Sequence, residues 1–71
     1  MNMQPVESSQ IHAVGYDAET KTLRVSFKSD GVYDYADVPE QMHADMLAAK
    51  SVGSFFHAHV RNVFKHTRLN P

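Results

Sequence analysis

Basic side chains near the end of the 71-residue chain have the type and spacing to bind phosphate. Arg61 and Lys65 are four positions apart, so on a helix they would share one face, and Arg68 would extend that line. The turn Ser51-Val52-Gly53-Ser54 precedes them and is typical of a capped helix start, whose N–H groups attract anions and whose Gly53 allows a close approach. These residues predict a phosphate-binding surface on a basic helix. The alternative is an ordinary solvated helix surface.

Tyr33 and Tyr35 could stack against the bases of single-stranded nucleic acid if they reach the surface. The alternative is that both rings fill the core of a small domain and direct their hydroxyls to its rim. A loop of Ser29-Asp30-Gly31, with Gly31 left-handed, would pair Phe27 with Tyr33 and place both tyrosines on the apolar face. A loop one residue longer or shorter would turn them outward. We favour the inward register, because the position of Gly31 fits it and because it places Asp34 on the polar face, away from the core.

The charge distribution is uneven although the net charge is only −1. Residues 1–49 contain three basic and eight acidic side chains, a net charge of −5, whereas residues 50–71 contain four basic side chains and no acidic one. This split indicates two electrostatic faces on one small body. Cations are also favoured at helix C-termini without any ligand, so the split by itself does not decide between a binding face and ordinary surface.

The five histidines and the serines offer no recognisable catalytic or metal-binding pattern. The chain has no Cys and no His-Glu-x-x-His sequence, and His57 and His59 would point in different directions on a helix. Ser54 and His57 lie one helical turn apart, but no acid follows to orient such a pair. We therefore expect no enzymatic activity, no metal and no other cofactor.

Alternating apolar and polar residues predict three antiparallel strands, over residues 11–16, 22–28 and 32–36. Two helices follow, one from Pro39 to near Lys50 and one capped by Ser51. The second has an apolar stripe at helical spacing: Phe56, Val60, Val63 and Phe64. The predicted fold is α+β, a three-stranded antiparallel β-meander followed by two α-helices packed on one face of the sheet.

The length predicts one domain. We expect a flexible leader over residues 1–9 and a single domain over residues 10–68, with residues 67–71 forming a tail or at most a short edge strand. No signal-peptide pattern and no apolar run of about 20 residues is present, so we expect no membrane partner and a cytoplasmic location.

The order of motifs is similar to that of a known family. The motifs are the run Phe27, Gly31, Tyr33-x-Tyr35 and Val38-Pro39, then Ser51-x-Gly53-x-Phe55-Phe56, then Val60-Arg61 and Phe64. They resemble the KTSC domain, named after the C-terminal extension of some lysyl-tRNA synthetases and also found as small free-standing bacterial proteins. The resemblance covers residues 8–68.

What the resemblance implies is an association with RNA. It places the family's motif positions on Tyr33, Tyr35, Ser51, Gly53, Phe55, Phe56 and Arg61. Two positions depart from the family pattern: His57 stands where Asn is common, and Phe64 where Tyr is common. Any contact that those polar groups make with a ligand would differ in this protein.

Taken together, these observations predict a small bacterial binding module for RNA or tRNA. Its expected contacts are Tyr33, Tyr35, Ser51, Gly53, Arg61, Lys65 and Arg68. The alternative is a non-catalytic protein-interaction or adaptor domain, monomeric or weakly homodimeric. Phe55, which lies off the apolar stripe, is the candidate contact for that alternative.

Overall fold

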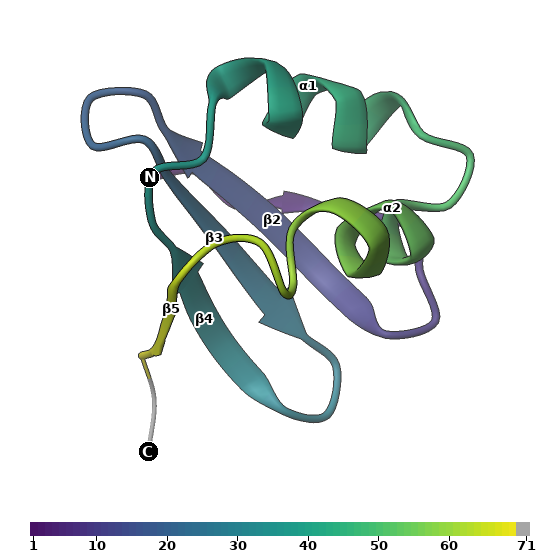
Figure 1. Ribbon diagram of the computed structural model, residues 1–71. Coiled ribbons are helices and arrows are strands. Elements are labelled where there is room, and N and C mark those ends of the chain that lie inside the picture. The colour runs from purple at the N-terminus through teal and green to yellow at the C-terminus, as the bar shows by residue number, and fades with distance from the viewer. Residues whose placement is uncertain (70–71) are drawn as a thin grey trace.

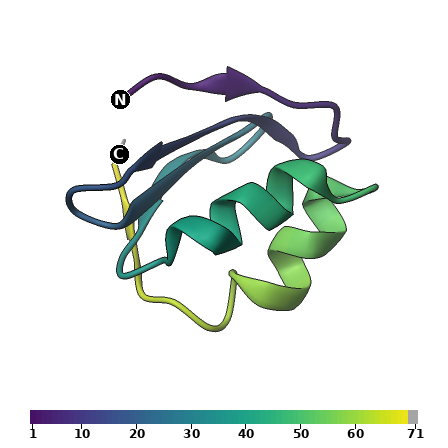
Figure 2. The same ribbon diagram turned by 90° about the horizontal axis from the view of Figure 1, so that it is seen from above.

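The computed structural model describes residues 1–69, so Asn70 and Pro71 of the predicted tail lie outside the described residues. The elements, in chain order, are β1 (Gln4–Pro5), β2 (Ile11–Asp17), β3 (Thr22–Phe27), β4 (Gly31–Tyr35), α1 (Glu40–Ala48), α2 (Val52–His59) and β5 (His66–Arg68). The strands form one antiparallel sheet in the order β1-β2-β3-β4-β5. Both helices pack on one face of this sheet (Figures 1 and 2).

The α+β class is confirmed, but the prediction of three strands is wrong, because the structure has five. β1 lies within the segment predicted as a leader and pairs Gln4 with Val14 and Pro5 with Ala13. β5 lies where the tail or short edge strand was predicted, and it pairs with β4. Both strands are at sheet edges and have two and three residues, too few for an alternating pattern to show in the sequence.

The hairpin of β3 and β4 determines where the tyrosines point. Phe27 pairs with Gly31 and Val25 pairs with Tyr33, so the predicted pairing of Phe27 with Tyr33 is wrong by two residues. Because side chains alternate with a period of two, a shift of two keeps both tyrosines on the predicted inner face. Gly31 has the expected positive φ, 104°, at the end of the turn.

The outer face of the same hairpin has an ion pair. Arg24 stands opposite Asp34, with Nε 2.8 Å from Oδ1 and Nη2 3.1 Å from Oδ2. This is the bidentate geometry that suits a guanidinium and a carboxylate. It agrees with the prediction that Asp34 faces away from the core.

The two helices begin near the predicted positions. Pro39 caps α1 instead of being its first residue, and α1 ends at Ala48, slightly before Lys50. Ser51 caps α2 as predicted, since its hydroxyl accepts a hydrogen bond from the Ser54 N–H at 3.2 Å. None of the helices within residues 1–69 is both long and apolar enough to cross a bilayer.

The predicted length of the second helix is wrong, because α2 ends at His59. The N–H groups of Val60 and Arg61 both donate to the Phe56 carbonyl, at 2.9 and 3.0 Å, and the chain then leaves the helix. Val63, predicted to be apolar core, is 65% exposed. The segment returns to the sheet, where pairing with β4 satisfies backbone groups that a longer helix would leave unpaired.

The core lies between the inner sheet face and the helices. Its buried members are Ile11, Val14, Leu23, Val25, Tyr35, Val38, Met46, Val52, Phe56 and Val60. Tyr33, Phe27 and Phe55 pack against this core but remain partly exposed. The rim of the core, near the turn between β3 and β4, is where the candidate site is found.

Candidate binding pocket

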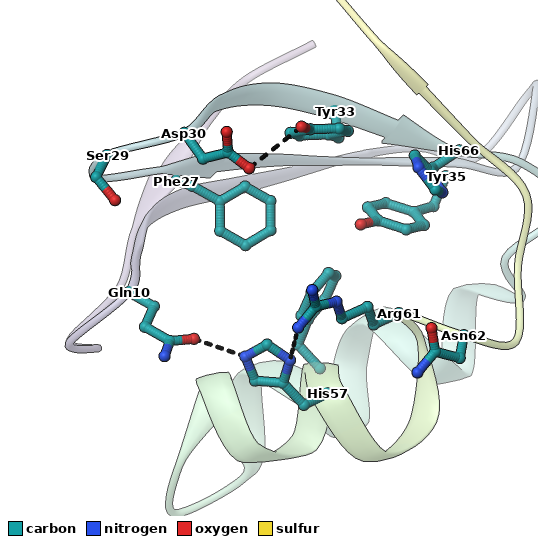
Figure 3. Close-up of a pocket in the computed structure, with 11 residues that line it drawn as sticks. Gln10, Phe27, Ser29, Asp30, Tyr33, Tyr35, His57, Arg61, Asn62 and His66 are labelled. Carbon is teal, nitrogen blue, oxygen red and sulfur yellow. Dashed lines mark hydrogen bonds between the residues drawn. The ribbon is translucent and has the colours of Figure 1, made fainter.

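A pocket of about 470 Å³ opens between the turn end of the sheet and α2. Its lining residues come from parts of the chain that lie far apart in the sequence, between Gln10 and His66 (Figure 3). The lining residues are Gln10, Phe27, Ser29, Asp30, Tyr33, Tyr35, Phe56, His57, Arg61, Asn62 and His66. A pocket of this size is within the range of sites that hold small organic ligands.

Aromatic rings form the inner wall of the pocket. Phe56 is fully buried and its ring centroid lies 5.4 Å from that of Phe27 and 5.3 Å from that of Tyr35, both in edge-to-face arrangements. Tyr33 meets Phe27 in the same way at 5.7 Å. Edge-to-face contacts are favourable for aromatic pairs, so each ring holds its neighbour in orientation. The wall is therefore preformed.

Polar groups occupy the side of the pocket next to α2. His57 Nε2 lies 2.6 Å from Gln10 Oε1, and His57 Nδ1 lies 3.3 Å from Arg61 Nη1 (Figure 3). A guanidinium can only donate, so Nδ1 accepts from Arg61 and Nε2 carries the proton donated to Gln10. His57 thus positions the guanidinium of Arg61.

Arg61 has no carboxylate partner in the described part of the chain. Within residues 1–69 the single ion pair is that of Arg24 with Asp34. Arg61 is exposed and is bound through one N–H to a neutral ring, so its charge is available to an anion. The structure thus places Arg61, whose contact with phosphate stays a prediction, in the lining of the pocket.

The hydroxyl of Tyr35 points into the pocket (Figure 3). Tyr35 is only 4% exposed, yet its hydroxyl has no hydrogen-bond partner within residues 1–69 and is not sealed from solvent. Burial raises the pKa of Tyr35, and the nearby positive charge of Arg61 partly opposes that rise. The phenol therefore stays protonated and can donate to an acceptor that enters the pocket.

Tyr33 lies at the rim. Its hydroxyl donates to Asp30 Oδ2 at 3.2 Å, and the guanidinium carbon of Arg68 lies 5.9 Å from its ring centroid. The pairing of β4 with β5 places Arg68 opposite Tyr33 and His66 opposite Tyr35. The His66 ring is 5.5 Å from that of Tyr35 and closes this end of the pocket.

The structure brings together some of the predicted contacts and separates others. Tyr33, Tyr35 and Arg61 line the pocket and Arg68 adjoins it, whereas Lys65 is exposed outside it. The prediction that Arg61, Lys65 and Arg68 form a basic stripe on one helix is wrong, because α2 ends at His59, before Arg61. Lys65 belongs to the segment entering β5, and its carbonyl accepts from the Ala36 N–H.

The predicted phosphate turn lies at the other end of α2. Ser51 and Gly53 do not line the pocket. A Cβ at Gly53 would lie 3.1 Å from Ser8 Oγ, so a side chain there would press against the chain's own N-terminal segment. Close packing within the protein accounts for Gly53 without a ligand.

Several lining residues carried no signal in the sequence. Gln10 and His57 are 47 positions apart, and no local pattern connects them. Phe27 was expected as core, whereas Asp30 was expected in a turn; neither pattern shows that a pocket opens between them. One feature of the sequence pointed to His57: it departs from the family pattern, in which Asn is common at this position. A polar residue at that position of α2 lines the pocket in this structure.

A second cavity, of about 510 Å³, lies on the sheet face away from the helices. Its lining includes Met3, Pro5, Ala13, Val32 and Leu69 together with His12, Arg24 and Ser26. In Figure 2 the β1 segment lies on this side of the sheet. None of the predicted contacts lines this cavity.

The described residues form neither a metal site nor a hydrogen-bonded Ser–His pair at Ser54 and His57. Within residues 1–69 no group of three or more His, Asp and Glu side chains is arranged to hold a metal ion. No hydrogen bond joins Ser54 to His57 there, because the His57 ring is bonded to Gln10 and Arg61.

Comparison with known proteins gives consistent matches. The family model described as the KTSC domain matches residues 7–64. A protein of Tsukamurella paurometabola is 42% identical over 67 residues, which is 94% of this chain and all of that protein. The crystal structure of a KTSC domain protein from Yersinia pestis has a TM-score of 0.95 and 35% identity, covering 97% of each chain.

The domain also occurs as part of a larger protein. A lysine–tRNA ligase of Nostoc sp. is 34% identical over 64 residues, which is 90% of this chain but 11% of the ligase. The resemblance drawn from the sequence motifs is confirmed by the family match over residues 7–64 and by the solved structure. This chain belongs to the KTSC domain family.

Proposed function

We propose that this KTSC domain is a non-catalytic RNA-binding module and that its pocket is the contact for RNA. The observation that carries the proposal is the meeting of an aromatic wall with Arg61, whose charge is not paired within residues 1–69. The occurrence of the same domain in lysine–tRNA ligases makes tRNA the first RNA to test.

The chemistry of the pocket suits single-stranded RNA better than a duplex. Unpaired bases bind proteins through stacking on aromatic rings and hydrogen bonds to their edges, while phosphates bind Arg and Lys. Phe27 and Tyr33, which line the pocket and are partly exposed, offer the rings, and Arg61 offers the charge. Lys65 and Arg68 are exposed on the segment beyond α2 and would contact neighbouring phosphates.

Phosphate binding at Ser51 and Gly53 stays a prediction that is separate from the pocket. These residues lie at the start of α2, and the Ser51 hydroxyl is already bonded to the Ser54 N–H. A contact there would be an additional one, because α2 separates it from the pocket.

The protein-interaction alternative gains no support from its candidate residue. Phe55 is partly buried against the core, and its ring lies 4.5 Å from that of His59. Much of its apolar surface is thus used inside the domain, so we adopt the RNA-binding proposal.

The test is a titration of labelled single-stranded RNA and of a tRNA pool at ~50 mM and ~200 mM salt. We expect binding to weaken with salt, and Arg61→Ala/Lys65→Ala to reduce the log–log salt slope by about 1 to 2. Lys21→Ala/Lys50→Ala removes the same charge from exposed positions outside the pocket and serves as the control. No binding at low salt, or equal losses in both variants, would count against the proposal.

A further inference from the structure

The shape of the pocket restricts what can enter it. Phe56 closes the inner end, since its buried ring touches those of Phe27 and Tyr35. The Gln10–His57 hydrogen bond spans one side, and His66 covers the β5 end (Figure 3). These groups line three sides of the pocket.

Two polar groups directed into this space are suited to an anion. Arg61 is held by His57 through one N–H, which leaves its other guanidinium N–H groups free to donate. The Tyr35 hydroxyl has no partner within residues 1–69 and can donate as well. The opposing effect of the Arg61 charge on the pKa of Tyr35 agrees with the two groups facing each other.

The opposite end of the pocket has different chemistry. Asp30 lies there beside the Tyr33 hydroxyl, and its carboxylate would repel a phosphate. Phe27 lies between Asp30 and the α2 side, with its ring lining the pocket (Figure 3). The pocket is thus polarised, with an anion-binding end at Arg61 and Tyr35 and an aromatic end at Phe27.

We propose that the pocket holds one unpaired nucleotide, with its phosphate between Arg61 and Tyr35 and its base against Phe27. The volume of about 470 Å³ is sufficient for one such unit. This inference rests on the proposed function in taking RNA as the ligand, but it names the unit recognised. The nucleotide comes either from a strand end or from an internal position that is flipped out of the stack.

The first experiment uses adenosine 5′-monophosphate, adenosine and inorganic phosphate as separate probes in an amide NMR titration. We expect the monophosphate to shift the amides of Phe27, Tyr35, Phe56 and Arg61. Adenosine and inorganic phosphate should each bind about tenfold or more weakly, because each lacks half of the contacts.

Tyr35→Phe is the sharpest variant, because it removes one hydroxyl and keeps the ring in the core. This variant should bind the monophosphate about five- to tenfold more weakly, as expected for the loss of a hydrogen bond to a charged oxygen. Lys50→Ala, on the loop between the helices, is the matched control and should leave binding unchanged. The fold of each variant is checked by its amide spectrum without ligand.

Oligonucleotides distinguish the two sources of the nucleotide. Tighter binding of a 5′-phosphorylated oligomer than of its 5′-hydroxyl form supports a strand end. Equal binding of both forms, with competition by the monophosphate, supports an internal flipped-out nucleotide.

The two experiments separate nucleotide binding in the pocket from RNA binding by the domain. If RNA binds but the monophosphate leaves the pocket amides unshifted and Tyr35→Phe binds RNA normally, the single-nucleotide pocket is wrong and RNA binding stands. If the monophosphate binds in the pocket and no RNA binds, the pocket assignment stands and RNA binding is wrong.

Discussion

The side chains of Gln10 and His57 are 47 positions apart in the sequence and lie 2.6 Å apart in the structure. The contact joins the segment before β2 to the middle of α2, and it sets which nitrogen of His57 faces Arg61. A single hydrogen bond between an amide and an imidazole thereby connects the sheet to the charged side of the pocket.

We expect this contact to be measurable as a coupling. In a double-mutant cycle of Gln10→Ala and His57→Ala, urea unfolding should show a coupling free energy of about 0.5 to 1 kcal/mol, as is usual for an exposed neutral hydrogen bond. His57→Ala should also weaken RNA binding, because Arg61 loses its support, while Gln10→Ala should weaken it less. Strictly additive effects on stability would show that the hydrogen bond is not formed in solution.

Two tyrosine hydroxyls in this domain differ in their partners and should differ in their effect on stability. The Tyr16 hydroxyl donates to the Val38 carbonyl at 2.5 Å, and the Val38 N–H donates to the Lys21 carbonyl at 2.9 Å. Both bonds hold the link between β4 and α1, where Asp37 has a φ of 58°. Tyr16→Phe should lower the free energy of unfolding by about 1 to 2 kcal/mol.

Tyr35→Phe is the control for that measurement. The Tyr35 hydroxyl has no partner within residues 1–69, so its removal should change the free energy of unfolding by less than about 0.5 kcal/mol. Equal losses in both variants, measured by urea unfolding, would contradict the assigned hydrogen bonds.

His43 should make stability depend on pH. Its ring stacks on Tyr16 with centroids 5.1 Å apart, and burial lowers its pKa, an effect that Glu40 partly offsets. Because the unfolded chain takes up a proton near the ordinary pKa of about 6.5 while the folded chain resists it, this contribution is present above that pH. It is lost as the pH falls from about 7 through the unfolded pKa towards the lower folded one.

The measurement is the unfolding midpoint in urea between pH 7.5 and 5.5. We expect the stability of the wild type to decline as the pH falls over this range, and His43→Gln should reduce that decline. His12→Gln, at an exposed position on β2, should not reduce it. The same decline in the His43→Gln variant and in the wild type would rule His43 out as its source.

Gly15 should be sensitive to an added methyl group because of what covers the outer face of β2. A Cβ there would lie 2.7 Å from Met3 Sδ and 2.9 Å from the Asn2 carbonyl oxygen. Gly15→Ala should therefore displace the N-terminal segment and cost about 1 to 3 kcal/mol. Removing residues 1–3 should relieve the clash, so in that shortened chain Gly15→Ala should cost much less. Equal costs in both backgrounds, measured by thermal unfolding, would show that the segment does not pack on Gly15.

Local rules account for the parts of the fold that the sequence predicted. The cap at Ser51 and the positive φ of Gly31 follow from a residue and its near neighbours. The alternation of β3 established which face is apolar, and it placed Tyr33 and Tyr35 on that face even though the predicted register was two residues off. A period of two tolerates a shift of two.

The sequence by itself thus determined the α+β class, the inner position of the tyrosines and the KTSC family. The tertiary structure decided that α2 ends at His59, that residues 4–5 and 66–68 pair as strands, and that Gln10, His57 and Arg61 meet. The fold class and the tyrosine positions depend on periodicity and turns within a few residues of each other, whereas the family was identified from the order of its motifs. The features that the tertiary structure decided depend on which backbone edges and side chains come together after the chain has folded, and no local pattern encodes that.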